Sequence, residues 1–303
     1  MVSISVLQHL DCGLPLEIGT KLDAKKNELQ MLPDAAAEAL ELVKDPNCTI
    51  AKFASVVERD VKLAADILAL ANSVMYSPGR PIASLQEAVV YVGFKKCQNI
   101  ILSSCAASMM QKLGDEQRSV RDALWQHSLT TAVVAAQLNK CLSLGFQGEE
   151  FTAGLLHDFG RLLLSALVPA KFSEFDRVSF DEAHSPTELE REHISTDHAA
   201  VGCAFVVNNR LPEELAEAVR YHHEPRRGKV AAKLVAATAL SDEIANYVHR
   251  DSNEPFDLQE RRGFAELVKQ GVHVGGSMLA SEWDEFLRVV RESVDAMSGS
   301  AVG

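Results

Sequence analysis

The chain has 303 residues, 47% hydrophobic and 24% charged, a balance typical of folded globular proteins and not of disordered ones. Its net charge of -12 argues against non-specific nucleic-acid binding, which needs clustered cations. No segment approaches the roughly 18 apolar residues of a membrane span, and no basic stretch followed by an apolar block marks a secretory leader, so we expect a cytoplasmic protein with neither nucleic acid nor membrane as partner.

Helical periodicity dominates the first half of the chain, and alternating strand patterns are almost absent, which predicts an all-α fold. Residues 1–30 have the weakest pattern and are expected to form an N-terminal arm, extended or as a short strand. Helices are predicted at Pro33–Val43, Ile50–Glu58, Asp60–Val74, Ser84–Gly93 and Lys95–Leu113. Together these helices predict an N-terminal helical subdomain over residues 31–115.

The second half is predicted to be helical as well. Helices are expected at Glu116–Leu142, Glu149–Val168, Pro186–Asn208, Pro212–His223 and Lys229–Val248, within a second helical subdomain over residues 116–250. The polar segment Asp251–Asp257 contains Pro255 and predicts a linker. Beyond it, Leu258–Gly271 and Ser281–Met297 predict a C-terminal helical extension over residues 251–303. This extension either caps the second bundle or offers a surface to a partner.

The six cysteines are far apart in the chain and form no CxxC pair. Several lie among apolar residues of predicted helices. The six are Cys12, Cys48, Cys97, Cys105, Cys141 and Cys203. We expect them to be reduced core residues of a cytosolic protein.

Seven imidazole and carboxylate side chains of the second half fall on or beside apolar helix stripes. They are His127, His157, Asp158, His198, His222, His223 and Asp242. Desolvating an unpaired carboxylate at such a position costs on the order of several kcal/mol, so each group needs a partner. Imidazole and carboxylate are the ligands of Zn, Fe and Mn, and five His with two Asp suffice for two ions that share a bridging carboxylate. The pattern predicts one metal centre; the alternative is a polar core network.

The remaining histidines lack an apolar stripe or a motif and are expected to be surface or local structural residues. They are His9, His184, His193, His249 and His273. A single His on an apolar face is more often a core residue than a ligand. Glu192 is expected either to accept a hydrogen bond from a ligand His or, more plainly, to be solvated.

The doublet in Gly154–Arg161 resembles the signature of the HD superfamily of metal-dependent phosphohydrolases. More specifically, the stretch from Leu32 to about Tyr247 resembles the HD-related output domain, HDOD. The matching motifs are Met31-Leu32-Pro33, Ala71-Asn72-Ser73, Ala88–Gly93, Thr196–Gly202, Leu211-Pro212 and His222–Pro225.

The resemblance implies a bacterial-type signal-transduction module in which an N-terminal helical bundle docks on an HD-like helical bundle. The seven candidates match the ligand positions of catalytic relatives such as the HD-GYP cyclic-dinucleotide phosphodiesterases, where Asp158 would be the bridging carboxylate. Three departures weaken that comparison. No Gly-Tyr-Pro follows His223, Arg161 replaces a Lys, and Ala123 stands where a Glu for a third metal is expected.

Two functions follow from the resemblance. The first is a regulatory protein that binds one or two divalent ions (Fe, Mn or Zn) and acts through a protein partner or a small phosphorylated ligand. The second is an active metal-dependent phosphohydrolase or phosphodiesterase, with Asp158 and Arg161 in catalysis. Arg161 would then bind the substrate; its alternative role is a salt bridge along a helix face.

Overall fold

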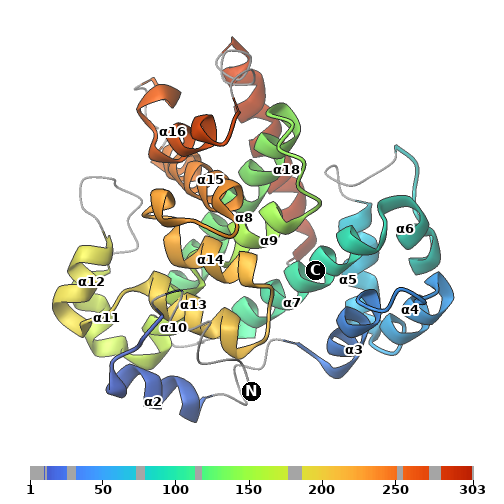
Figure 1. Cartoon of the computed structure of the whole chain (residues 1–303), viewed down its shortest axis with the longest axis horizontal. Coiled ribbons are helices and arrows are strands. Elements are labelled where there is room, and N and C mark those ends of the chain that lie inside the picture. Colours follow the sequence, from blue (N-terminus) through green and yellow to red (C-terminus); the bar gives the residue numbers. More distant parts are fainter. Residues whose placement is uncertain are drawn as a thin grey trace.

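The computed structural model describes residues 10, 12–25, 32–72, 79–112, 118–176, 186–250, 255–272 and 281–301. Throughout these ranges the chain is helix, turn or loop with no β-strand, which confirms the all-α prediction. Figure 1 shows one group of helices on the right, a larger group in the centre and on the left, and α7 running between them. None of the helices in these ranges is long and apolar enough to span a bilayer.

The first group follows the predicted boundaries closely. It consists of α3 (Asp34–Val43), α4 (Ile50–Val57), α5 (Val61–Ala71), α6 (Leu85–Val92) and the long α7 (Phe94–Lys112). The hydroxyl groups of Thr49 and Ser84 accept the backbone N–H of the third residue beyond them and so cap α4 and α6. The Asn72 side chain donates to the carbonyls of Leu68 and Ile82, and it joins the end of α5 to the segment that enters α6.

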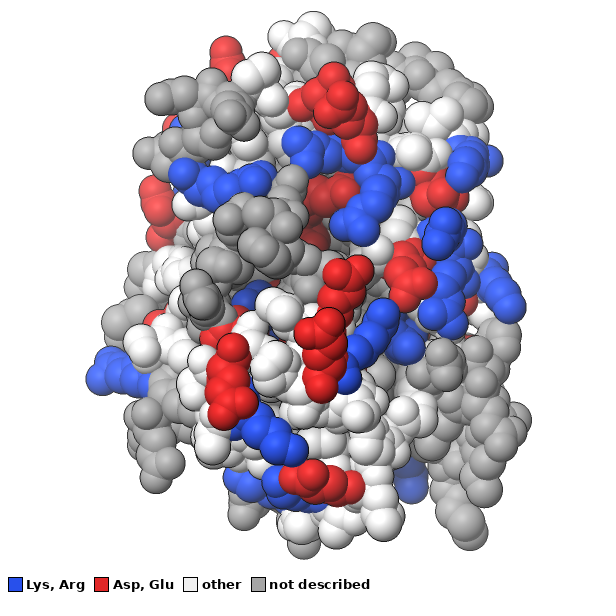
Figure 2. Space-filling model, turned by 90° about the vertical axis from the view of Figure 1, so that its left-hand side faces the viewer, with Lys and Arg blue, Asp and Glu red and all other residues white. Residues whose placement is uncertain are grey.

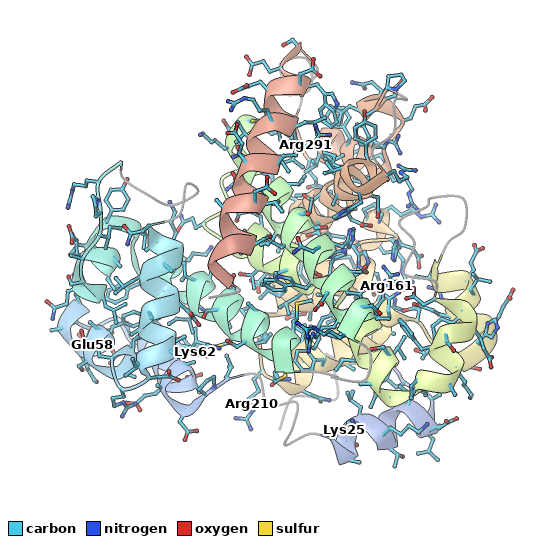
Figure 3. All side chains as sticks on the ribbon, turned by 180° about the vertical axis from the view of Figure 1, so that it is seen from behind. Lys25, Glu58, Lys62, Arg161, Arg210 and Arg291 are labelled. Carbon is cyan, nitrogen blue, oxygen red and sulfur yellow. A yellow bond between two sulfur atoms is a disulfide. The ribbon has the colours of Figure 1, made fainter. Side chains whose placement is uncertain are left out.

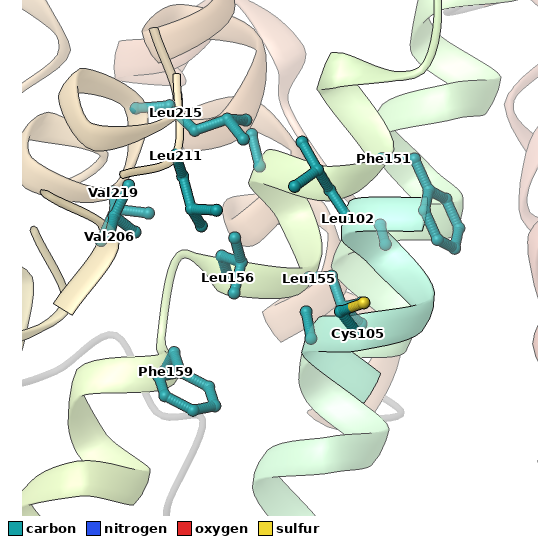
Figure 4. Close-up of a cluster of buried hydrophobic side chains, with 14 of the residues drawn as sticks. Leu102, Cys105, Phe151, Leu155, Leu156, Phe159, Val206, Leu211, Leu215 and Val219 are labelled. Carbon is teal, nitrogen blue, oxygen red and sulfur yellow. The ribbon is translucent and has the colours of Figure 1, made fainter. Parts of the chain in front are cut away.

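The central group contains the helices of the second predicted subdomain. In chain order these are α8 (Arg118–Cys141), α9 (Glu149–Leu156), α10 (Phe159–Leu167), α11 (Pro169–Phe175), α12 (Pro186–Ile194), α13 (His198–Asn208), α14 (Glu213–Tyr221), the 3-10 turn η2 (Pro225–Arg227) and α15 (Ala232–Arg250). Helix α9 packs on α8 and α7, while α13 packs on α10 and α14. Figure 4 shows the shared core, where Leu102 of α7 lies near Leu155 and Leu156 of α9.

Two helices that the periodicity predicted as continuous are broken in the structure. The helix expected over Glu149–Val168 stops at Leu156 and restarts at Phe159. The one expected over Pro186–Asn208 stops at Ile194, and α13 restarts behind Asp197, whose carboxylate accepts the backbone N–H of Ala200 at 2.7 Å. The prediction was wrong at both places because the apolar stripe continues across each break and hides it.

The N-terminal arm contains a helix that its weak pattern did not predict. Helix α2 (Leu16–Ala24) contacts α10 and lies beneath the central group (Figure 1). The Tyr221 hydroxyl donates to the carbonyl oxygen of Leu10, 3.1 Å away. The arm is therefore anchored to the second half of the chain.

One pair of cysteines corrects the expectation of six reduced thiols. Cys12 and Cys203 form a disulfide across 191 residues of sequence and tie the arm to α13. The expectation failed because the arm's contact with α13 is tertiary and leaves no local spacing in the sequence. Cys48, Cys97, Cys105 and Cys141 form no disulfide, and burial raises the pKa of the Cys97 thiol to about 12.

The C-terminal extension caps the second bundle. A short 3-10 turn, η3 (Leu258–Glu260), leads into α16 (Arg262–Lys269), which packs on α15, and α18 (Trp283–Ala301) packs along α8. Phe264, Leu267 and Val290 are buried in these contacts. Of the two roles that the sequence left open for this extension, the described helices perform the capping one.

Helices α10 and α13 approach so closely that only glycine fits at their contact. A Cβ atom at Gly160 would lie 1.9 Å from the carbonyl oxygen of His198, and 2.9 Å from the backbone nitrogen of Gly202. Because both obstacles are backbone atoms, they move only if the two helices separate. The contact holds the start of α13 against the start of α10.

We expect Gly160→Ala to lower the free energy of unfolding by about 3 kcal/mol or more, the upper end for overpacking a core. Chemical denaturation measures the change. Gly19→Ala in α2 is the matched control, because its Cβ would meet only an ordinary 3.9 Å contact. Alanine should stabilise that helix by about 0.5–1 kcal/mol. Equal effects of the two substitutions would contradict the close contact of α10 and α13.

Candidate metal centre

The structure brings all seven predicted side chains into one buried cluster in the second half. They arrive from five separate places: His127 from the middle of α8, His157 and Asp158 from the α9–α10 break, His198 from the first turn of α13, His222 and His223 from the end of α14, and Asp242 from α15. Six of the seven are buried, and only His223 is partly exposed. Each of the two helix breaks therefore places at least one residue of the cluster at a helix end.

Asp158 lies at the middle of this cluster. Its Oδ1 atom is 3.2 Å from Nε2 of His198 and 3.6 Å from Nε2 of His222, while its Oδ2 atom is 3.7 Å from Nε2 of His127. His157 Nε2 lies 3.7 Å from Oδ1. One carboxylate therefore faces imidazoles on two sides.

The remaining groups complete two neighbouring sets. Asp242 Oδ1 lies 3.1 Å from Nε2 of His127 and 3.6 Å from Nε2 of His157. On the other side, Nε2 of His198 is 3.0 Å from Nε2 of His223 and 3.4 Å from Nε2 of His222. The spacing suits metal coordination in three groups that share members: Asp158 with His198, His222 and His223; His127 with His157 and Asp158; and His157 with His222 and Asp242.

Hydrogen bonds on the outer side of the rings fix which nitrogen faces the cluster. Nδ1 of His157 lies 2.8 Å from the Gly154 carbonyl, Nδ1 of His222 lies 2.8 Å from the Val219 carbonyl, and Nδ1 of His198 lies 2.8 Å from the Glu190 carboxylate. Carbonyl and carboxylate oxygens only accept, so each Nδ1 carries a proton and donates. In the neutral rings, the Nε2 lone pairs then point inward.

Converging lone pairs and carboxylates require a cation between them. The buried Nε2 atom of His157 has no hydrogen-bond partner among the described residues. Nitrogen and carboxylate oxygen are the ligand types that Zn, Fe and Mn share. The donor set therefore fits a divalent metal ion. Without such an ion, protons on the imidazoles must balance the charge of the carboxylates.

The electrostatics of the carboxylates agree with a cationic surrounding. Burial alone would raise the pKa of Asp158, but His157 and Arg161 outweigh it and hold that pKa well below its usual range. Burial likewise opposes ionisation of Asp242, whose pKa is nevertheless held well below its usual range by His127 and His157. Both carboxylates are thus ionised near neutral pH.

The imidazoles divide into two classes. Burial lowers the pKa of His222 and, more strongly, that of His223, with repulsion from neighbouring rings adding to the effect. Burial also disfavours the charged form of His198, but Glu190 and Asp158 overcome it and raise that pKa well above the usual value. The pKa of His157 is raised in the same way by Asp158 and Asp242.

Arg161 is buried and committed to carboxylates of the protein itself. Its Nη1 atom donates to Asp158 at 3.0 Å, while Nε and Nη2 donate to Asp176 at 2.8 and 2.7 Å. Figure 3 shows Arg161 inside the second bundle, seen from behind. Of the two roles that the sequence left open, the structure places Arg161 in a salt bridge, extended by Asp176.

Two carboxylates next to the cluster were not singled out from the sequence. Asp176 binds Arg161, and Glu190 binds His198, whereas Glu192, which was considered, is exposed. A signal for Glu190 was present, because Thr187, Glu190 and Ile194 recur at helical spacing on the buried face of α12. Asp176 follows α11, a helix that the sequence pattern did not predict.

The other histidines follow expectation in part. His193 is exposed, and its Nδ1 atom lies 2.8 Å from the Leu189 carbonyl, as expected for a local structural role. His249 instead lies beside the cluster, with its ring centroid 5.5 Å from that of His127, and burial lowers its pKa to about 4. His9, His184 and His273 lie outside the described residues.

A cavity of the described surface lies elsewhere. A cavity of about 710 Å³ opens where α2, α3 and α7 meet the α13–α14 corner, near Arg210 at the junction seen in Figure 3. Leu40, Leu102 and Phe205 contribute to its wall. None of the seven cluster residues lines it, and among these seven only His223 is partly exposed.

Comparison with known proteins agrees with this geometry. The HDOD domain matches residues 29–225, more than half of the chain. An HDOD domain protein of unknown function from Geobacter sulfurreducens has 25% identity and a TM-score of 0.66, covering 86% of this chain and 92% of its own. A candidate phosphohydrolase from Shewanella amazonensis SB2B has the same fold at 22% identity, with a TM-score of 0.65, covering 90% and 98%.

A curated relative is longer. An uncharacterized protein of Treponema pallidum (strain Nichols) is 23% identical over 253 residues, which are 83% of this chain and 47% of that protein. The chain thus spans about half the length of this relative. On the domain match, the recurring fold and the residues that converge on the HD doublet, the chain belongs to the HDOD family.

Proposed function

We propose that the protein is an HDOD-type regulator that binds one or two divalent metal ions in its second bundle and acts through a protein partner or a small phosphorylated ligand. The observation that carries this proposal is the inward convergence of imidazole Nε2 atoms on the Asp158 carboxylate. His127, His157 and Asp242 would hold one ion together with Asp158. His198, His222 and His223 would hold the other, with Asp158 as the bridge.

The regulatory role is favoured over catalysis by the state of Arg161. A free cationic side chain is one means by which a phosphohydrolase holds the phosphoryl group of its substrate. The Arg161 guanidinium is buried and already donates to Asp158 and Asp176. We therefore assign Arg161 a positioning role and not substrate binding.

The second candidate is a metal-dependent phosphohydrolase or phosphodiesterase. It is favoured by the complete set of seven ligands and by the partial exposure of His223, which leaves one side of the cluster open to a ligand. The fold of the candidate phosphohydrolase from Shewanella amazonensis is compatible with it. Bound metal would supply Lewis acidity toward a phosphoryl oxygen and lower the pKa of water.

We expect the purified wild type, loaded separately with Fe²⁺, Mn²⁺ or Zn²⁺, to retain one or two ions per chain in elemental analysis. Asp158→Asn should weaken binding by more than the roughly 100-fold typical of outer-sphere changes, because both ligand sets share this carboxylate. Glu192→Gln, an exposed change on α12, is the control. A wild type that retains no ion, or Asp158→Asn binding as well as wild type, would refute the site.

Metal binding should also release protons. Neighbouring carboxylates raise the pKa of His157 and raise that of His198 well above its usual value, whereas Asp158 and Asp242 are already ionised. Coordination requires free Nε2 atoms, so we expect protons to leave these rings on metal loading and the affinity to fall as the pH decreases. Calorimetry in buffers of different ionisation enthalpy measures this release; a heat independent of buffer would contradict it.

Turnover separates the two candidate functions. We expect the metal-loaded wild type to leave phosphomonoesters, phosphodiesters and cyclic dinucleotides intact, because Arg161 is not available to hold them. Phosphate or nucleotide release is the measurement, with Asp158→Asn as the blank. Metal-dependent turnover that disappears in Asp158→Asn would favour the enzyme and overturn the regulatory assignment.

A further inference from the structure

The carboxylates that touch the cluster from outside come from one pair of packed helices, α11 and α12. Glu190 lies on α12, and Asp176 follows the last residue of α11. The two helices contact each other, and the rings of Phe175 and His193 lie 5.8 Å apart between them. Figure 2 views the molecule from the side that carries this pair, where acidic and basic side chains mingle over the surface. Glu190 and Asp176 are turned away from this exterior.

Glu190 holds His198 at two points. Its side chain is fully buried, with a relative exposure of 0%. One carboxylate oxygen accepts the backbone N–H of His198 at 2.8 Å, and the carboxylate also accepts the Nδ1 proton of the same ring at 2.8–2.9 Å. Backbone and ring are thus fixed by one group, which leaves Nε2 only one direction to face, toward Asp158.

Asp176 acts on Asp158 through Arg161. Its two oxygens take Nε and Nη2 of Arg161 at 2.8 and 2.7 Å, and the third donor, Nη1, reaches Oδ2 of Asp158 at 3.0 Å. A guanidinium held at two points by one carboxylate presents its remaining donor in a fixed direction. Asp176, directly after α11, therefore fixes the orientation of the Asp158 carboxylate through Arg161.

A third contact ties α12 to the beginning of α13. Arg191 donates from Nε to Asp197 at 2.8 Å, and Asp197 is the residue that caps α13. Arg220 lies 3.6 Å from the other oxygen of the same carboxylate. The helix start that carries His198 is thus fixed at the cap as well as at the ring.

Burying an acid this completely is costly unless it has a definite partner, and the packing of α12 alone does not require one. What the carboxylate adds is orientation and basicity for the His198 ring, the effect that outer carboxylates have on histidine ligands of metals.

We propose that the α11–α12 pair is a positioning clamp for the metal centre, in which Glu190 orients His198 and Asp176 orients Asp158 through Arg161. This inference rests on the proposed metal site. The two halves of the clamp act on different groups. Glu190 reaches only the set that contains His198, whereas Asp176 reaches the carboxylate common to both sets.

The test measures Zn²⁺ affinity of the full chain by competition with a chromophoric chelator. Glu190→Gln should weaken one of two binding events by about 10- to 100-fold and leave the other within about threefold. Asp176→Asn should weaken both events to a similar degree, because Asp158 is shared. Glu192→Gln, on the same helix two residues away and exposed, should match wild type. If the wild type binds a single ion, the clamp is tested by whether Glu190→Gln loses more Zn²⁺ affinity than Glu192→Gln does.

Two further readouts separate positioning from loss of fold. The melting temperature of the metal-free variants shows whether they are folded. Glu190→Asp keeps the charge, so it should recover part of the affinity lost in Glu190→Gln. Affinities equal to wild type in Glu190→Gln would overturn the clamp while leaving the metal site intact. A loss spread evenly over both binding events in Glu190→Gln would also overturn it, since that indicates general loosening. A wild type that binds no Zn²⁺ would instead refute the metal site itself.

Discussion

The Asp158 carboxylate can remain buried and ionised only because positive charge lies close to it. His157 and Arg161 lower its pKa against the effect of burial, and a divalent ion between the surrounding imidazoles would add to that charge. Much of the second bundle can be understood from this demand. Four separate segments must deliver one Nε2 atom each to within 3.2–3.7 Å of the same two oxygens, which fixes the relative positions of the helices as firmly as the apolar core does.

The breaks in the helices are the means by which the fold meets that demand. A residue at a helix break lies where two helix ends meet, whereas His127 and Asp242 reach the cluster from within long helices. Ending α9 at Leu156 and starting α13 at His198 places His157, Asp158 and His198 at such termini. Glycine at position 160 then lets the two termini approach to backbone contact. The N-terminal arm secures the same region from outside, since Cys12 is bonded to Cys203 of α13.

Sequence patterns predicted the all-helical fold, most helix positions and all seven members of the cluster, because an acid or imidazole on an apolar stripe is conspicuous. They failed where structure depends on tertiary contacts. The apolar stripe continues through His157 and through His198, so periodicity did not reveal the helix breaks beside these residues. The disulfide depends on an arm with too little periodicity to place. Glu190 shares the buried face of α12 with Thr187 and Ile194, and Glu192 faces solvent. The spacing distinguishes these faces but does not indicate that Glu190 meets His198. These failures concentrate around the cluster, as expected where local preference yields to a site.

The metal centre, its outer carboxylates and the preference for regulation over catalysis all depend on a cation at the convergence of the Nε2 atoms. Anomalous X-ray diffraction from crystals grown with Zn²⁺, recorded on both sides of the zinc edge, locates such an ion directly. We predict one or two peaks within about 2.0–2.2 Å of Nε2 and carboxylate oxygens, with Asp158 touching every peak. A zinc-loaded crystal with no anomalous peak among His127, Asp158, His198 and Asp242 would contradict the metal centre and leave a proton-linked polar core in its place.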